Sequence, residues 1–294
     1  MIVANNFCKG VQGLITYEQL TQKGGGLLNE DAIIVNPHAN VYGVVDGVSS
    51  LVPYQNANGE TGGFIAANLI KAHFESLAED ESLIDQLGKV NDQLREQMEL
   101  SNIDPNKKEE LWGAAAAIVR IHEDGVEYIQ TGDCMILAVY ENEEVRPLTW
   151  RQVSHLEAPA IVKWQEGITK GLRSQKELHE VVIDTLRQNR YQSNMDGGYG
   201  VLNGEERATR FFEYGRINRT CLKQIILLTD GLYPPNPIVP ERSPYWSFVA
   251  HEILNKGLEL YTRELLELEE NDPECIRYIR FKQSDDKTGV VIHV

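Results

Sequence analysis

The sequence predicts a layered α+β domain, because strand-like and helix-like segments come in separate runs along the chain. Short β-branched runs bounded by turn residues recur, and this pattern is typical of strands. Two long segments, between residues 62 and 100, place apolar residues three and four positions apart, as helices that bury one face do. A doubly wound parallel sheet would need strands and helices in regular alternation, and the sequence does not show it.

Two strands and two helices are predicted in the first hundred residues. The strands are Ala32–Val35 (AIIV) and Val41–Val45 (VYGVV), both rich in aliphatic and β-branched residues. The helices are Gly62–Glu79 and Leu83–Leu100. Their apolar faces are formed by Phe64, Ala67, Ile70, Phe74 and Leu77 in the first, and by Leu83, Leu87, Val90, Leu94 and Met98 in the second.

The rest of the chain predicts five strands and one helix. The helix is His251–Glu270, and it follows a proline-rich loop, Leu232–Pro240, that we expect to be exposed. Between the third and fourth of these strands lies a region that we expect to be irregular. The strands are Ala115–Ile121, Val126–Thr131, Met135–Tyr140, Ile225–Thr229 and Val290–Val294.

Composition excludes several classes of protein. A formal net charge of −16 argues against nucleic-acid binding, which needs clustered cations. The chain has no apolar run long enough for a membrane span, and Met1–Gly10 does not resemble a signal peptide. We therefore expect a cytoplasmic protein with neither nucleic-acid nor membrane partners. We expect one domain over residues 1–294, because no linker interrupts the chain.

The four cysteines do not form a metal-binding or disulfide pattern. Cys8, Cys134, Cys221 and Cys275 are far apart in sequence and include no CxxC pair. A domain of this size needs no disulfides for stability. We therefore expect reduced thiols.

Acidic residues recur next to the predicted strands, more often than ordinary turn sequences would explain. They occur in Asn29-Glu30-Asp31, Asp46-Gly47, Gly132-Asp133, Asp230-Gly231 and Asp285-Asp286. Each Asp-Gly pair taken alone is explained by turn chemistry. Repetition at strand edges instead suggests a set of oxygen ligands, and such a set suits Mg²⁺ or Mn²⁺ better than Zn²⁺.

Six motifs in this order resemble those of the metal-dependent PP2C-type serine/threonine phosphatases. They are NEDAIIV, VYGVVDGV, WGAAAAIV, TGDC, IILLTDGL and SDDKTGVVIHV, and they extend over essentially the whole chain. The resemblance implies an α-β-β-α sandwich of two antiparallel sheets flanked by helices, with a metal site in a cleft at one edge.

The resemblance also implies a role for each acidic residue. Asp46 would bridge two metal ions, with the Gly47 carbonyl on one of them, and Asp230 would complete the pair together with Asp285. Glu30 and Asp31 match the acidic pair near the site and would act partly through bound water. Asp133 matches the ligand of a looser third ion. The sequence leaves open whether Asp285 or Asp286 is the ligand, and the family pattern favours Asp285.

The implied activity is hydrolysis of phosphoserine or phosphothreonine in proteins by a water that two Mg²⁺ or Mn²⁺ ions activate, with Asp46 and Asp230 as the catalytic carboxylates. One alternative is a phosphatase for a small phosphorylated metabolite. Another is a regulatory pseudophosphatase that binds a partner. Four retained carboxylates, which repel one another without a cation, argue against the pseudophosphatase.

The sequence departs from the family pattern at three places. Gly26 replaces the arginine that commonly grips the substrate phosphate, and either Lys23 or backbone amides of the glycine run would have to substitute. The three glycines could also be only a flexible loop. Val48 replaces a histidine proton donor, so water would have to take that role. Ser49 and Ser50 replace the usual glycines, which questions a close backbone approach there.

Three further features carry open interpretations. Cys134 follows Asp133, and we favour a packed thiol over a nucleophile because no basic partner is evident. Trp150–Leu202 matches the variable flap of relatives, so it is either a substrate-selecting element or a solvated excursion. His155 and His179 within it are expected to lie at the surface.

Overall fold

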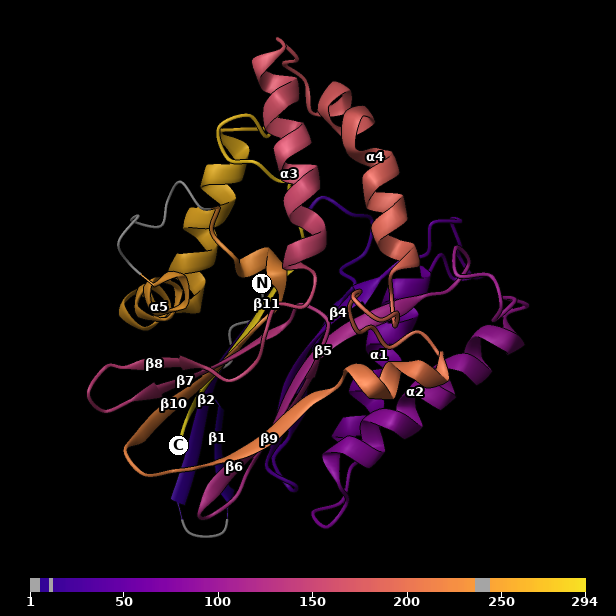
Figure 1. The fold of residues 1–294 in the computed structure, drawn as a ribbon. Helices are drawn as coiled ribbons and strands as arrows, with labels where there is room; N and C mark the ends of the chain where they lie inside the picture. The colour runs from indigo at the N-terminus through magenta and orange to yellow at the C-terminus, as the bar shows by residue number, and fades with distance from the viewer. Residues whose placement is uncertain (1–5, 11–12, 236–243) are drawn as a thin grey trace.

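Two antiparallel β-sheets pack face to face and carry helices on both outer faces (Figure 1). The computed structural model describes residues 6–10, 13–235 and 244–294. This arrangement confirms the α-β-β-α sandwich that the motifs implied. The expected loop Leu232–Pro240 lies partly outside the described residues, and so does the side chain of Cys8.

The first sheet has six strands, and its central strands come from the end of the chain. The C-terminal strand lies between the second strand and the strand that precedes Asp230. In spatial order the strands are β1 (Asn6–Gly10), β2 (Gly13–Gln22), β11 (Lys287–His293), β10 (Leu222–Leu228), β7 (Met135–Tyr140) and β8 (Val145–Pro147).

The second sheet has five strands in nearly sequential order. Its neighbours are all antiparallel. The strands are β3 (Asp31–Asn36), β4 (Val41–Val48), β5 (Gly113–Ile121), β6 (Gly125–Thr131) and β9 (Glu213–Asn218). Short turns join β3 to β4 and β5 to β6, whereas the β4–β5 connection contains two helices and the β6–β9 connection contains β7, β8 and the helix pair above the strand ends.

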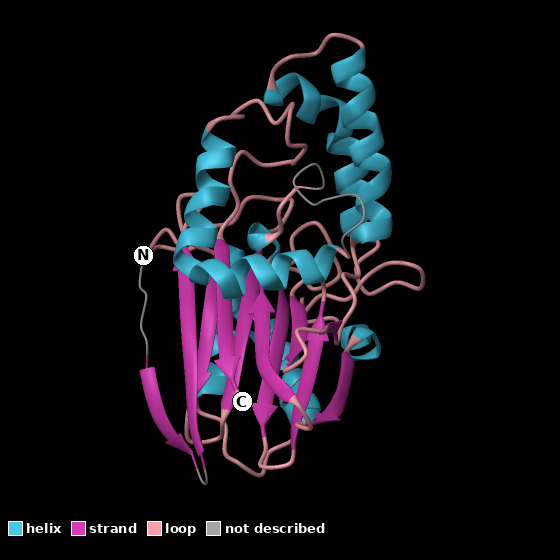
Figure 2. Ribbon diagram, turned by 90° about the vertical axis from the view of Figure 1, so that its left-hand side faces the viewer, coloured by secondary structure: helices cyan, strands magenta, loops and turns pink. Residues whose placement is uncertain are grey.

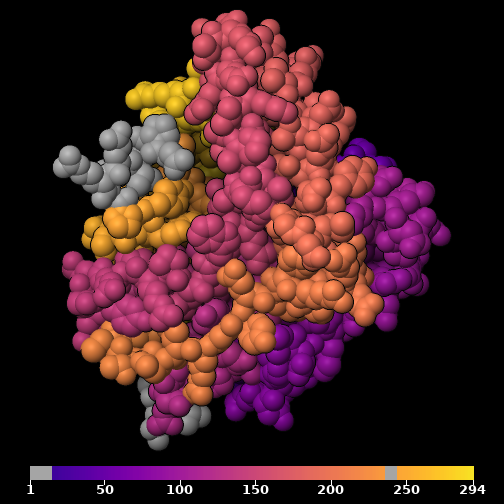
Figure 3. All heavy atoms as spheres, in the orientation of Figure 1, coloured from indigo at the N-terminus to yellow at the C-terminus, as the bar shows by residue number. Residues whose placement is uncertain are grey.

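Helices cover the two outer faces and one end of the sandwich. Helices α1 (Gly62–Glu75) and α2 (Leu83–Leu100) cover the second sheet, and α5 (Tyr245–Glu270) lies across the first (Figures 1 and 2). Helices α3 (Ser154–Thr169) and α4 (Gln175–Tyr191) stand as a pair above the ends of the strands. In the space-filling view the same pair projects from the top of the molecule (Figure 3).

The buried apolar residues form three layers and one separate cluster. The layer between the sheets contains residues such as Tyr42, Val119 and Leu227. One outer layer joins the second sheet to α1 and α2, and the other joins the first sheet to α5. The separate cluster, which includes Trp164 and Leu178, holds α3 and α4 together and packs them on the segment that follows α5. The helix pair is therefore anchored mainly through its own small core.

Several predicted elements have the observed bounds, and others are longer or were not predicted. Leu83–Leu100 and Met135–Tyr140 agree with the structure at both ends. The strand predicted at Val41–Val45 continues to Val48, so Asp46 does not follow the strand but lies inside it. The sequence prediction missed β1, β2, β8 and β9, and the region expected to be irregular contains the two long helices α3 and α4.

No helix in the described part of the chain is long and apolar enough to cross a membrane.

Candidate metal centre

Strand register brings five aspartates to the same end of the sandwich. Asp31 begins β3 and faces Asp46 directly across the antiparallel pair. Asp46 is opposite Ala115 on β5, and Ala116 is opposite Thr131, which lies two residues before Asp133. In the other sheet the end of β10 pairs with the start of both β7 and β11, at Leu228. The segments that carry Asp133, Asp230 and Asp285 therefore meet at this end.

Glycines next to two of these aspartates allow the backbones to approach closely. A side chain on Gly47 would come within 2.3 Å of the Gly63 carbonyl, and one on Gly231 within 1.9 Å of the Asp286 carbonyl. Neither Gly47 nor Gly231 has a positive φ angle. Turn conformation, the alternative for these Asp-Gly pairs, is therefore not the reason for glycine here. The reason is close packing, of the start of α1 against Gly47 and of the segment before β11 against Gly231.

The pKa values of Asp31, Asp46, Asp133 and Asp230 are raised in the folded protein. Burial is the largest cause for Asp46, and the charges of Asp31, Asp230, Asp133 and Asp285 raise its pKa further. Burial followed by repulsion from Asp285 and Asp133 raises the pKa of Asp230 to about 7. A group of carboxyls that resist ionisation together is stabilised by cations placed among them.

Individual contacts show which oxygens are free to bind a cation. Asp31 is only 8% exposed, and its Oδ2 accepts a hydrogen bond from Thr229 Oγ1 at 2.8 Å. Asp230 Oδ1 is buried and has no hydrogen-bond partner among the described residues. A buried acceptor without a partner is costly, and a divalent cation is a partner for such an oxygen. The oxygen donors therefore fit Mg²⁺ or Mn²⁺.

The carboxylates are near one another without forming a closed ligand shell. Among the residues that the structure describes, no three His, Cys, Asp or Glu side chains are gathered tightly enough to hold a metal ion by themselves.

The structure distinguishes Asp285 from its neighbour. Asp286 accepts hydrogen bonds from the backbone N–H groups of Gly24 and Glu30, both at 2.7 Å, so its two oxygens hold the loop after β2 in place. The carboxylate of Asp285 contacts Lys282, an exposed side chain, at 2.8 Å. Oδ1 of Asp285 also accepts from the Asp286 N–H at 3.1 Å, but no other segment of the described structure is held by this carboxylate. The choice of Asp285 over Asp286 as a ligand stays a prediction.

Glu30 is directed toward the start of α1. Its Oε1 accepts hydrogen bonds from Ser49 Oγ, at 2.7 Å, and from Thr61 Oγ1, the residue that caps α1. Its backbone carbonyl accepts from the Gly47 N–H at 3.1 Å. Ser49, which departs from the family pattern, is thus used to hold Glu30. Hydroxyl groups thus engage one oxygen of the Glu30 carboxylate, and its role at a metal site stays a prediction.

The sequence analysis did not identify Arg151, a positively charged side chain at this site. Arg151 lies after β8, and its Nη2 donates to Glu157 Oε2 at 2.6 Å. Burial lowers the pKa of Arg151, but the charges of Glu157, Asp230 and Asp133 outweigh burial and raise it. No motif marked Arg151 in the sequence, because Asp133, Asp230 and Tyr233 come near it only in the folded chain.

The predicted substrate contact of Lys23 is not evident in the structure. Lys23 is exposed, and its Nζ donates to the carbonyl of Gly26 at 3.0 Å, within its own loop. Gly24, beside it, lies against the Asp285–Asp286 backbone. The loop therefore reaches the candidate site, but the lysine side chain folds back on the loop.

The other sequence interpretations can be placed as well. Cys134 is fully buried in the layer between the sheets, and burial raises the pKa of its thiol well above the ordinary value, as expected for a packed residue. Cys134, Cys221 and Cys275 are free thiols. His155 is exposed and contacts the Gly197 carbonyl at 2.8 Å, whereas His179 is half-buried.

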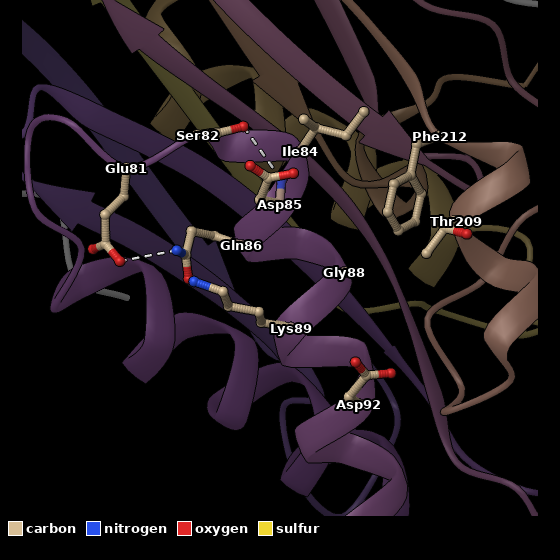
Figure 4. Close-up of a pocket in the computed structure, with 10 residues that line it drawn as sticks. All are labelled: Glu81, Ser82, Ile84, Asp85, Gln86, Gly88, Lys89, Asp92, Thr209 and Phe212. Carbon is tan, nitrogen blue, oxygen red and sulfur yellow. Dashed lines mark hydrogen bonds between the residues drawn. The ribbon is translucent and has the colours of Figure 1, made fainter.

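Two hollows in the described surface lie away from the aspartates. One, of about 670 Å³, is lined by the start of α2 and by Thr209 and Phe212 (Figure 4). In Figure 4 Glu81, Ser82 and Asp85 belong to this helix start, and the hydrogen bonds drawn there join only neighbours on it. A second hollow, of about 350 Å³, is lined by Trp150 and His155. Neither hollow contains any of the five aspartates.

Comparison with solved structures shows the same fold in bacterial phosphatases. The serine/threonine phosphatase Stp1 from Staphylococcus aureus is 15% identical, with a TM-score of 0.54, and the match covers 100% of this chain and 99% of that one. PppA from Pseudomonas aeruginosa, described as a regulatory component of a secretion system (T6SS), is 15% identical with a TM-score of 0.56, covering 95% and 98%. The PstP catalytic domain, in complex with two manganese ions, is 16% identical with a TM-score of 0.54, covering 95% and 97%.

A sequence search finds no match among curated proteins. The profile of the protein phosphatase 2C family, however, matches residues 21–261, which is most of the chain. This range contains Asp31, Asp46, Asp133 and Asp230, and the solved structures share the fold around it. The chain therefore belongs to the protein phosphatase 2C family.

Proposed function

We propose that the protein is a Mg²⁺- or Mn²⁺-dependent phosphatase that hydrolyses phosphoserine or phosphothreonine in proteins. The observation that carries the proposal is the convergence of five aspartates from both sheets at one end of the sandwich, with a buried oxygen of Asp230 left without a partner. Family membership supports a phosphatase, and the two manganese ions in the PstP structure support the choice of metal.

In this proposal the residues divide into ligands and residues that hold the ligands. Asp46 would bridge two ions, Asp230 and Asp285 would complete the pair, and Asp133 would hold a looser third ion. Asp31 and Glu30 would act nearby, since hydroxyl groups already engage their carboxylates. Bound divalent cations supply a water nucleophile at neutral pH and neutralise charge on the phosphoryl group.

The chain's own contribution includes fixing Asp31 to the strands of the other sheet. Thr229 donates to Asp31 through its hydroxyl, and the same hydroxyl accepts from the backbone N–H of Thr288 at 2.9 Å. Asp31, the end of β10 and the start of β11 are thereby joined in one hydrogen-bonded chain. Residues that are already fixed lose little entropy when substrate binds, and this favours an in-line arrangement for hydrolysis.

We further propose that residues 1–294 act as one phosphatase domain, in which Trp150–Leu202 selects the substrate. The region contains α3 and α4, which stand above the strand ends that carry the aspartates (Figure 1). A protein substrate that delivers a phosphorylated side chain to those strand ends would contact this helix pair.

Asp46→Asn and Asp230→Asn test the metal assignment. Each should lower Mn²⁺-dependent hydrolysis of phosphothreonine peptides at least about a hundredfold, because each removes an anionic ligand. Circular dichroism and gel filtration should show that both variants remain folded. Asp124→Asn, which removes a carboxylate at the opposite end of β6, is the matched control and should retain activity.

The outcome also separates the alternatives. Activity within a few-fold of wild type in either Asn variant would contradict the dinuclear assignment. Turnover of small phosphomonoesters without turnover of phosphopeptides would indicate a metabolite phosphatase. Wild-type protein that binds Mn²⁺ but hydrolyses neither substrate would indicate a pseudophosphatase.

A further inference from the structure

Arg151 is held rigidly beside the candidate metal centre by two contacts. Glu157, in the first turn of α3, binds its Nη2 at 2.6 Å, and the guanidinium carbon lies 5.5 Å from the centre of the Tyr233 ring. The Tyr233 hydroxyl donates to the Asp133 carbonyl at 2.5 Å. The guanidinium is therefore tied, through one aromatic ring, to the turn that carries Asp133.

The guanidinium keeps a donor that nothing in the protein uses. Arg151 Nε is buried and has no hydrogen-bond partner among the described residues, although the side chain as a whole is 30% exposed. No described hydrogen bond joins Arg151 to Asp133 or Asp230, although both carboxylates act on it electrostatically. A buried N–H without an acceptor costs free energy. Arg120 and Arg207 also have such an Nε, but Arg151 is the one of the three beside the aspartates, where a substrate oxygen would satisfy it.

The other cations near the aspartates are already engaged. Lys23 donates to carbonyl groups of its own loop, and Lys282 contacts Asp285 at 2.8 Å. Gly26 has no side chain to offer. Arg151 is thus the cation in this part of the described structure that combines a fixed position with an unused buried donor.

We propose that Arg151 binds the phosphate group of the substrate, with Glu157 and Tyr233 orienting the guanidinium for that contact. The inference rests on the proposed phosphatase function and names the group that replaces the missing phosphate contact at Gly26. Arginine suits the role because its planar, permanently charged group forms directional hydrogen bonds with phosphate oxygens. A phosphate oxygen would accept from Nε, while Glu157 holds Nη2.

The competing explanation is that Arg151 serves only as an internal counter-ion for Asp133 and Asp230. The two roles differ in what they affect. A phosphate contact changes the binding of phosphate and substrate, whereas a counter-ion changes the binding of metal cations, because its removal leaves the carboxylates more negative.

The experiment compares wild type, Arg151→Gln and Arg151→Lys, with Arg216→Gln as the matched control. Arg216 is exposed and pairs with Asp124 at the opposite end of β6. KM for 4-nitrophenyl phosphate, inhibition by inorganic phosphate, and calorimetric binding of inorganic phosphate in the presence of Mn²⁺ are measured for each protein. Calorimetric Mn²⁺ binding and the melting temperature are measured in parallel, so that folding and metal affinity are controlled.

We expect Arg151→Gln to raise KM and the phosphate dissociation constant together, by about ten- to a hundredfold. Its Mn²⁺ affinity should stay within about threefold of wild type, and Arg151→Lys should recover part of the phosphate binding because it keeps the charge. Arg216→Gln should match wild type.

Unchanged phosphate binding in Arg151→Gln, or a change confined to Mn²⁺ affinity, would overturn the proposal in favour of the counter-ion. Failure of the proposed function would appear differently, as wild-type protein without metal-dependent turnover. In that case calorimetric phosphate binding still decides the role of Arg151. If Arg151→Gln does not fold, the folded Arg151→Lys variant decides it by the same two dissociation constants.

Discussion

Asp31 and Asp46 face one another across neighbouring strands, and stability alone does not explain this pair. Like charges directly opposite each other on an antiparallel pair are destabilising, and burial raises both pKa values further. Apolar residues at these two positions would extend the surrounding core without repulsion. The proposed role of both residues at a metal site would explain why the fold keeps this pair at a cost in stability.

Gly24 offers a test of how closely the ligand loop must pack. A side chain there would lie 2.4 Å from the Asp285 backbone carbonyl carbon, so Gly24→Ala must displace Asp285 or the loop. We predict that Gly24→Ala weakens Mn²⁺ binding at least about tenfold, because ligand positions shift by a large fraction of an ångström. Calorimetric titration with Mn²⁺ measures the effect.

The neighbouring residue supplies the control for this prediction. A side chain on Gly25 would come no nearer than 3.5 Å to other atoms, an ordinary contact, so Gly25→Ala should bind Mn²⁺ like wild type. Equal Mn²⁺ affinities in the two alanine variants would mean that the position of Asp285 does not control metal binding.

At the level of elements, the end of α5 is connected to the ligand loop by a buried ion pair. The Lys287 side chain is fully buried, and its Nζ contacts both oxygens of Glu269 at 2.9 Å. The same Nζ donates to the Asp285 carbonyl at 3.0 Å. Lys287 thus fixes the backbone of a proposed ligand to a helix on the outer face of the sheet.

We predict that Lys287→Met lowers the free energy of unfolding by about 3–5 kcal/mol, because Glu269 would be left buried without its partner. Lys287→Met combined with Glu269→Gln should recover part of that loss. Urea unfolding measures both. Lys256 forms a more exposed ion pair with Glu264 on the same helix, and Lys256→Met should cost less than about 1 kcal/mol.

Mn²⁺ affinity shows whether Lys287 only stabilises the fold or also positions Asp285. If Lys287 positions Asp285, the double variant should remain impaired in Mn²⁺ affinity even where its stability recovers. Mn²⁺ affinity that follows stability back to the wild-type value would show that the ion pair stabilises the fold without positioning the ligand.

The elements that the sequence could predict are those whose pattern is local. Leu83–Leu100 has a continuous apolar face and a Ser82 cap, and both its ends were predicted correctly. β2 was missed because Tyr17 faces the other sheet while Leu20 faces α5, so both faces are covered and polar alternation is lost. For α4 a signal was present, since Ser174 and Glu177 form a capping box.

Some residues of the candidate site could also be predicted from the sequence, and others could not. The acidic motifs could be read from the sequence because each lies beside a strand that is itself recognisable. Arg151 could not, because its role depends on Tyr233, which lies far along the chain and meets it only after folding. Likewise, the difference between Asp285 and Asp286 appears only when Gly24 and Glu30 are seen to donate to Asp286.

The whole molecule carries a formal net charge of −16, and the five aspartates concentrate part of that charge at one end. Repulsion among these negative charges disfavours the compact folded state. Between about pH 4 and pH 7 the folded chain binds more protons at Asp31, Asp46, Asp133 and Asp230 than the unfolded chain does, because folding raises the pKa values of these four carboxyls. The contribution of these groups to stability is therefore present at low pH and is lost as pH rises.

Divalent cations should reverse that loss, and the effect should depend on pH. A cation that binds only the folded chain adds about 2.7 kcal/mol of stability at a hundred times its Kd, which corresponds to a rise of roughly 5 °C in Tm for a chain of this size. The ion must displace protons from carboxyls such as Asp230, whose pKa is about 7.

We predict that millimolar Mn²⁺ raises Tm more at pH 7.5 than at pH 5.5, and that EDTA abolishes the rise. Because a highly acidic protein also attracts cations diffusely, Asp46→Asn is the decisive comparison: it should lose most of the Mn²⁺ effect, and equal stabilisation of variant and wild type would place the metal elsewhere.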